Sequence, residues 1–81
     1  MNKEKLRTCF SRTLGIPMER VTDDLAYNTI EEWDSVGHMA LVADIESAFD
    51  VMLDTDDILN LSSVGEAVKI LGRLGVSFDA A

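Results

Sequence analysis

The sequence is poor in the residues that build disulfides, metal sites and β-sheets. It has one cysteine, one histidine and only 6% aromatic residues. The lone Cys9 cannot form an internal disulfide, and His38 has no cysteine or histidine cluster around it that would indicate a zinc site. Strand-forming residues are scarce, so helix is favoured. No run approaches membrane-spanning length, and the charged N-terminus lacks the apolar segment of a signal peptide, so we expect a cytoplasmic protein.

Positive charge is missing from the middle of the chain. No Lys or Arg occurs from Val21 to Val68, although 12 of the 15 acidic residues lie there, and the net charge is −8. Nucleic-acid binding needs the opposite sign, so we expect no nucleic-acid partner. An acidic surface either keeps a small protein soluble or steers it towards basic partners, and composition leaves both explanations open.

Apolar residues recur at helical spacing in four segments that turn signals separate. The first predicted helix covers residues 3–14, and the strongest pattern predicts a helix over residues 35–49. A short acidic helix is expected to begin with residues 54–57, and a capping box at residues 63–66 opens the last helix. The apolar face of the second helix is expected to hold Met39, Val42, Ile45 and Phe49.

Residues 16–34 show no clean period and predict a long loop, which apolar side chains such as Trp33 pin to the core. With 81 residues, the chain is expected to form a single domain over residues 1–81. The predicted fold is all-α, a small four-helix bundle with one short third helix and a long loop between helices 1 and 2. Residues 75–81 are expected to fray.

A serine lies where this long loop meets the second helix, in the segment EEWDSVGHM of residues 31–39. The free N–H groups at a helix N-terminus and the helix dipole favour an anion, so a phosphate ester on Ser35 is electrostatically sensible. Taken alone, however, a serine at this position is more often only an N-cap. The residues themselves leave both interpretations open.

Asp34-Ser35-Val36, set in this order of helices, resembles the attachment site of the acyl carrier protein family, whose signature is Asp-Ser-Leu at the start of the second helix. The resemblance covers nearly the whole chain, because the family has the same succession of helix, long loop, Asp-Ser, long helix, short acidic helix and last helix. It implies that Ser35 carries 4′-phosphopantetheine, added from coenzyme A by a phosphopantetheinyl transferase. The thiol of that arm would hold the cargo as a thioester.

The sequence differs from the family pattern at two places on the second helix. Val36 replaces the usual leucine, and Ala40 and Ser47 stand where housekeeping fatty-acid carriers have acidic residues. These differences argue against service to the general fatty-acid pathway, and Trp33 and Gly37-His38 resemble discrete carriers that work with dedicated adenylating or condensing enzymes. The resemblance implies three kinds of partner: the transferase, an acyl- or aminoacyl-loading ligase or acyltransferase, and condensing or other downstream enzymes of fatty acid, polyketide or nonribosomal peptide biosynthesis. We expect the carrier to be a monomer.

The resemblance also assigns roles to single residues and makes the chain a carrier that catalyses nothing. Ser35 is the attachment point, and Asp34 orients the transferase encounter or caps the helix. Tethering raises the effective concentration of the cargo at each partner. The surface that partners recognise is expected to include Val36, Met39, Asp44, Glu46, Asp56 and Asp57.

Two other classes of function remain open. One is a helical interaction module without a prosthetic group, in which Ser35 is only an N-cap. The other is a minimal hydrolase, because His38 lies about one helical turn from Ser35, although no G-x-S-x-G elbow is present. Burial of His38 under the loop, or a contact to the phosphate of the arm, is favoured over catalysis. Calcium binding after Asp54 is rejected, because the following residues do not fit an EF-hand loop.

Overall fold

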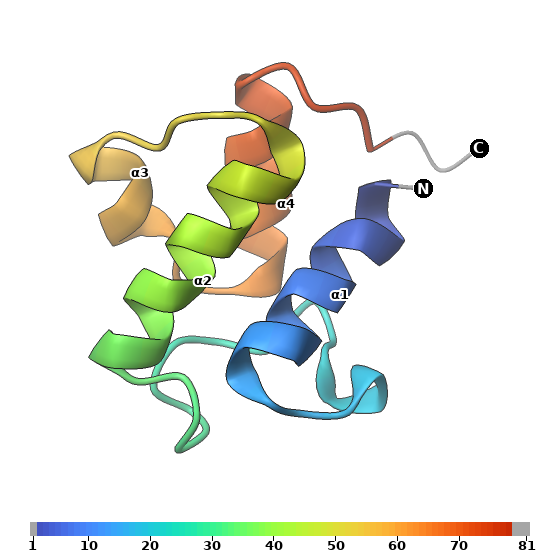
Figure 1. Cartoon of the computed structure of the whole chain (residues 1–81), viewed down its shortest axis with the longest axis vertical. Coiled ribbons are helices and arrows are strands. Elements are labelled where there is room, and N and C mark those ends of the chain that lie inside the picture. Colours follow the sequence, from blue (N-terminus) through green and yellow to red (C-terminus); the bar gives the residue numbers. More distant parts are fainter. Residues whose placement is uncertain (1, 79–81) are drawn as a thin grey trace.

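The computed structural model describes residues 2–78, which form four α-helices and one short 3-10 helix, with no β-strand (Figure 1). The elements are α1 (Asn2–Leu14), η1 (Met18–Arg20), α2 (Ser35–Phe49), α3 (Thr55–Asn60) and α4 (Val64–Arg73). This confirms the prediction of an all-α bundle with a short third helix and a long loop between the first two α-helices. None of the described helices is long and apolar enough to cross a membrane.

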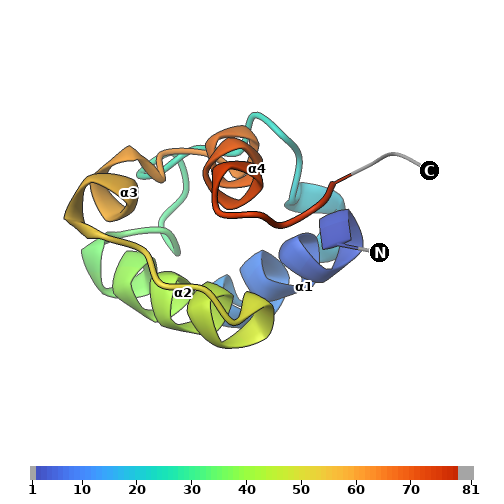
Figure 2. The ribbon, with the colours of Figure 1, turned by 90° about the horizontal axis from the view of Figure 1, so that it is seen from above.

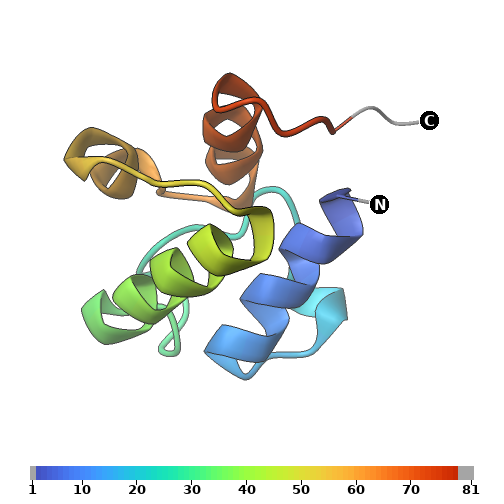
Figure 3. The ribbon, with the colours of Figure 1, turned by 45° about the horizontal axis from the view of Figure 1, so that its top comes forward.

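The helices pack in two layers. α1 and α2 lie side by side and run in opposite directions (Figures 1 and 3). Viewed from above, α3 and α4 lie over this pair (Figure 2). Buried side chains fill the space between the layers, and those on helices are Leu6, Cys9, Phe10 and Leu14 of α1, Leu41, Val42 and Ile45 of α2, and Val64, Ala67, Ile70 and Leu71 of α4.

Three helices begin at side-chain caps that the sequence supplies. An N-cap oxygen accepts a hydrogen bond from an N–H group in the first turn, where the helix itself offers no acceptor. The capping pairs are Asp34 with the Gly37 N–H at 2.9 Å, Asp54 with the Asp57 N–H at 2.8 Å, and Ser63 with the Glu66 N–H at 3.1 Å. These caps explain why the helix starts match the predicted ones closely.

The loop between α1 and α2 is fixed to the core at both of its ends. Trp33 is fully buried, as predicted, and its ring meets that of Phe10 edge-on with centroids 5.2 Å apart. Arg7 of α1 donates hydrogen bonds to the carbonyls of Met18 and Val21, at 2.7 and 3.0 Å. The chain that leads into α2 is therefore held in place by tertiary contacts, although it contains no α-helix.

The buried face of α2 differs from the expected one. Leu41, Val42 and Ile45 are buried, whereas the Met39 side chain is 57% exposed and Phe49 is only partly buried. Apolar residues occur all round this helix, so a 3.6-residue period fits more than one face. Packing against the neighbouring elements selects the face that holds Leu41.

The segment that follows α4 contacts the core through two apolar side chains. Val76 and Phe78 pack against the core, and the Phe78 ring lies 6.2 Å from that of Phe49. The side-chain amide of Asn2 donates to the Ser77 carbonyl at 2.7 Å. Residues 79–81 lie outside the described part of the chain, and fraying of the tail stays a prediction.

Candidate functional site

Ser35 is the first residue of α2, and its side chain is exposed. Asp34, not Ser35, is the N-cap, since its carboxylate accepts the N–H of Gly37. Among residues 2–78, the Ser35 hydroxyl has no hydrogen-bond partner. The interpretation of Ser35 as only a helix cap is therefore wrong, and its hydroxyl is available for chemistry at a helix N-terminus.

Gly37 brings the loop close to the first turn of α2. A Cβ atom added there would lie 2.5 Å from the carbonyl oxygen of Glu32 and 3.3 Å from Cδ2 of Leu14. The first distance is a clash with backbone, so only glycine allows this approach. The role of Gly37 was not identified from the sequence, because the contact depends on how the loop folds back on the helix.

A cavity of about 290 Å³ opens beside Ser35, between α2, α3 and the loop. Its walls are mostly apolar, and it is lined by Tyr27, Ser35, His38, Met39, Ile58, Leu59, Leu61 and Ser62. Of these lining residues, the sequence pattern indicates only Ser35, His38 and Met39 of α2. The other lining residues come from the loop and from α3 and the residues just after it. Those of the α3 region lie more than 20 residues from Ser35 in the sequence, so no local pattern connects them with this serine.

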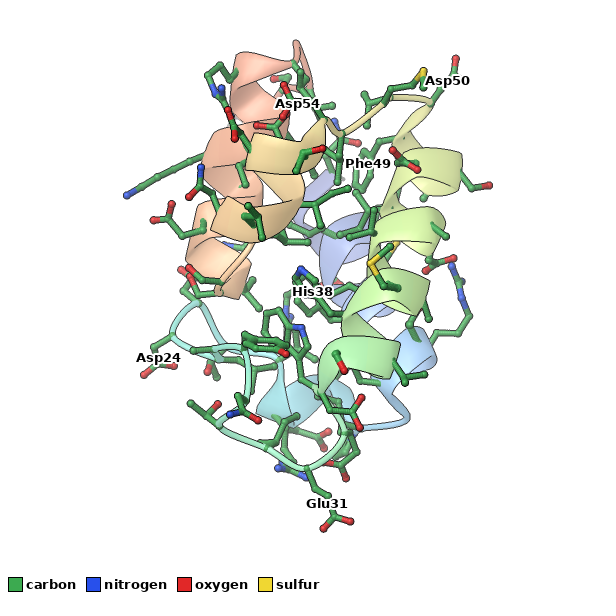
Figure 4. All side chains as sticks on the ribbon, turned by 90° about the vertical axis from the view of Figure 1, so that its left-hand side faces the viewer. Asp24, Glu31, His38, Phe49, Asp50 and Asp54 are labelled. Carbon is green, nitrogen blue, oxygen red and sulfur yellow. The ribbon has the colours of Figure 1, made fainter. Side chains whose placement is uncertain are left out.

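His38 points from α2 into the interior (Figure 4) and joins three segments of the chain. Its Nδ1 accepts the indole N–H of Trp33 at 3.0 Å, and its Nε2 lies 2.9 Å from the carbonyl oxygen of Ile58 at the end of α3. The indole nitrogen can only donate, so Nε2 carries the proton and donates to Ile58. Neither ring nitrogen is left to activate Ser35 or to contact a phosphate, which argues against the hydrolase.

Two carboxylates expected at the partner surface are engaged within the fold. Asp44 accepts hydrogen bonds from Arg12 through both oxygens, each at 2.9 Å, and from the Thr13 hydroxyl at 3.1 Å. Glu46 accepts the N–H of Leu53 at 2.8 Å. These bonds join α2 to α1 and to the segment that follows α2, so both side chains support the structure.

Asp57 is the clearest departure from the expected surface. Its side chain is buried, with the residue only 4% exposed, and it forms an ion pair with Arg73 of α4. The expectation that Asp57 is exposed is wrong, because α3 turns this position towards α4. Asp56, its neighbour, is exposed, and so are Val36 and Met39. The described residues contain no group of three or more His, Cys, Asp or Glu side chains that could hold a metal ion.

Comparison with known proteins places this site in a family. The model of the phosphopantetheine attachment site matches residues 4–71. The chain is 31% identical over 67 residues to an acyl carrier protein of Lactobacillus johnsonii, and the aligned residues make up 83% of this chain and 84% of the relative. It is 30% identical over 59 residues to an acyl carrier protein of Kineococcus radiotolerans, covering 73% of each.

The matches and the geometry agree. The relatives imply a covalently attached 4′-phosphopantetheine and a carrier that has no catalytic activity of its own. An exposed, unbonded serine hydroxyl at the N-terminus of α2, beside an apolar cavity, is suited to such a group. This chain belongs to the acyl carrier protein family, the carriers with a phosphopantetheine attachment site.

Proposed function

We propose that Ser35 carries 4′-phosphopantetheine and that the chain tethers an acyl or aminoacyl group on this arm and delivers it to partner biosynthetic enzymes. In the loading step a transferase would join the Ser35 Oγ to the β-phosphorus of coenzyme A. The hydroxyl proton leaves, the pyrophosphate bond breaks and adenosine 3′,5′-bisphosphate departs. The bound arm supplies a thiol that holds the cargo as a thioester.

The position of the Ser35 hydroxyl is the observation that carries this proposal. It is exposed and unbonded among the described residues, because Asp34 has taken the capping role. The first N–H groups of the 15-residue helix α2 would favour the phosphate of the arm. Asp34 keeps its carboxylate on the Gly37 N–H, so it would fix the orientation of the first turn when the transferase binds.

The cavity beside Ser35 would hold the apolar part of the cargo. Tyr27, Ile58 and Leu61 supply apolar walls next to the attachment point. An apolar group that leaves water for such a surface is stabilised by about 25 cal/mol per Å² of area buried. Enclosure of this kind would also keep water away from a nearby thioester.

The test is modification with coenzyme A, Mg²⁺ and a broad-specificity phosphopantetheinyl transferase, followed by intact mass. The wild-type chain should gain one phosphopantetheine, and Ser35→Ala should gain none. Ser62→Ala is the matched control, because Ser62 lines the same cavity and should leave the gain unchanged. Absence of a mass gain in the wild type, or an equal gain in Ser35→Ala, would contradict the assignment.

A further inference from the structure

Two walls of the cavity beside Ser35, the loop before α2 and the segment that follows α3, are joined through their backbones. The Tyr27 N–H of the loop donates to the Ser62 carbonyl at 2.8 Å. The Val64 N–H donates to the Leu25 carbonyl at 3.0 Å, which extends the same pairing. These bonds hold the loop and the α3 region together along one edge of the cavity.

His38 fastens both of these walls to α2, the third wall (Figure 4). Its Nδ1 accepts the indole N–H of Trp33 at 3.0 Å, and its Nε2 donates to the Ile58 carbonyl at 2.9 Å. Within residues 2–78, the bond to Ile58 is the one hydrogen bond between α2 and α3. Trp33 is fully buried, so moving the loop away from α2 would leave its N–H without an acceptor, which is unfavourable. A single side chain therefore limits how far the walls can separate.

The volume of the cavity suits a short apolar group. It is about 290 Å³, with mostly apolar walls. An apolar protein cavity of about 150 Å³ binds one molecule of benzene, so a cavity of roughly twice that volume holds about twelve carbon atoms. Ser35 is exposed and is itself a lining residue, so an arm attached there begins at the opening of the cavity. A longer acyl chain would extend into water unless the walls moved apart.

We propose that His38 is a specificity-determining residue, which limits the cargo held in the cavity to an acyl group of about twelve carbon atoms or fewer. This inference rests on the proposed role of Ser35 and names the class of cargo, a short or medium-length acyl chain. Each methylene group up to the limit leaves water for an apolar wall and stabilises the loaded protein. Further methylene groups stay in water, since α3 would have to leave His38 to admit them.

The test measures the thermal unfolding midpoint of the chain loaded on Ser35 with acyl groups of increasing length. A broad-specificity transferase attaches the acyl-phosphopantetheine of acetyl-, hexanoyl-, decanoyl- or hexadecanoyl-coenzyme A, and intact mass verifies each product. The midpoint is expected to rise by about 4 °C or more from the acetyl to the decanoyl form, and to rise no further in the hexadecanoyl form. A midpoint that keeps rising with hexadecanoyl would overturn the size limit.

Two substitutions of His38 separate its two bonds. His38→Asn removes the bond to α3 but keeps an amide oxygen near the position of Nδ1 for Trp33, so the hexadecanoyl midpoint should exceed the decanoyl one. His38→Gln keeps an amide N–H that can donate to Ile58, so it should keep the limit. Asp44→Asn is the matched control, because it weakens the link between α1 and α2 away from the cavity. It should lower all midpoints without changing their dependence on chain length.

The outcomes distinguish this inference from the proposed function. An unchanged limit in His38→Asn, or loss of the limit in His38→Gln or Asp44→Asn, would overturn the role of His38. A wild-type midpoint that does not rise from acetyl to decanoyl, in chains that mass shows to be loaded, would overturn the inference while leaving attachment at Ser35 intact. Absence of the mass gain itself would contradict the proposed function instead.

Discussion

The indole N–H of Trp33 donates to Nδ1 of His38 across 3.0 Å, and this bond decides what the rest of the imidazole does. With Nδ1 occupied as an acceptor, Nε2 must carry the proton, and it donates to the Ile58 carbonyl at 2.9 Å. One side chain of α2 thereby holds the end of the loop and the end of α3, the two segments that wall the cavity beside Ser35.

Loss of this bridge should destabilise the protein. His38→Ala would leave the fully buried Trp33 indole without its acceptor. An unsatisfied buried donor costs about 1–3 kcal/mol, so we expect the free energy of unfolding to fall by about that amount. Urea unfolding followed by circular dichroism measures it.

A double-mutant cycle assigns the loss to the bond. In a Trp33→Phe background there is no indole N–H, and His38→Ala should cost less than in the wild-type chain. Equal costs in the two backgrounds would mean that the Trp33–His38 bond contributes nothing measurable.

Gly37 should tolerate no side chain, in contrast with another helical glycine. Gly37→Ala puts Cβ 2.5 Å from the Glu32 carbonyl oxygen, and the backbone shift needed to relieve this clash should cost about 1–3 kcal/mol. Gly72→Ala, with open space around the new atom, should stabilise the protein by up to about 1 kcal/mol through helix propensity. Thermal unfolding of the two variants should therefore shift in opposite directions, and a shared direction would contradict the close approach of the loop.

The sequence was sufficient to place the helices because the start signals are local. Asp54 and Ser63 stand next to the N–H groups that they cap, so the signals and the helices coincide. Local signals of this kind do not predict which face of α2 is buried. Apolar residues surround that helix, and only contact with the other elements shows that Leu41 is inside and Met39 outside.

At the candidate site, too, the sequence predicts some features and not others. Ser35 and Asp34 were identified because their segment carries the family pattern, and their places in the structure fit it. The ion pairs of Asp44 and Asp57 do not follow from the local sequence, because their partners are distant in the chain: Arg12 lies 32 residues from Asp44, and Arg73 lies 16 residues from Asp57.

Cys9 provides a prediction for alkaline pH. Burial, with a smaller contribution from the nearby Asp44 carboxylate, raises the pKa of Cys9 from 9.0 to about 11. The folded chain therefore holds the neutral thiol, while the unfolded chain ionises it at lower pH. The contribution of Cys9 to stability should be complete below pH 9.0 and be lost as the pH rises towards about 11.

The contribution of Cys9 is isolated by comparison with Cys9→Ala. Other groups titrate over the same range in both proteins, so the difference between their urea midpoints reports the thiol. This difference should shrink or reverse as the pH rises above 9.0. A difference that does not change with pH would contradict the raised pKa.

Asp57 and its neighbour Asp56 in α3 should differ in how much they stabilise the protein. Asp57→Ala removes a buried carboxylate that pairs with Arg73 of α4, and should lower the free energy of unfolding by about 1–3 kcal/mol. Asp56→Ala removes an exposed carboxylate, and its loss near a helix N-terminus should cost about 0.3–1 kcal/mol. Arg73→Ala should be less harmful once Asp57 is already alanine, because the two side chains then no longer depend on each other. If Asp57→Ala slowed partner enzymes without changing stability, its carboxylate would be a recognition element after all, and the ion pair that links α3 to α4 would not be its main role.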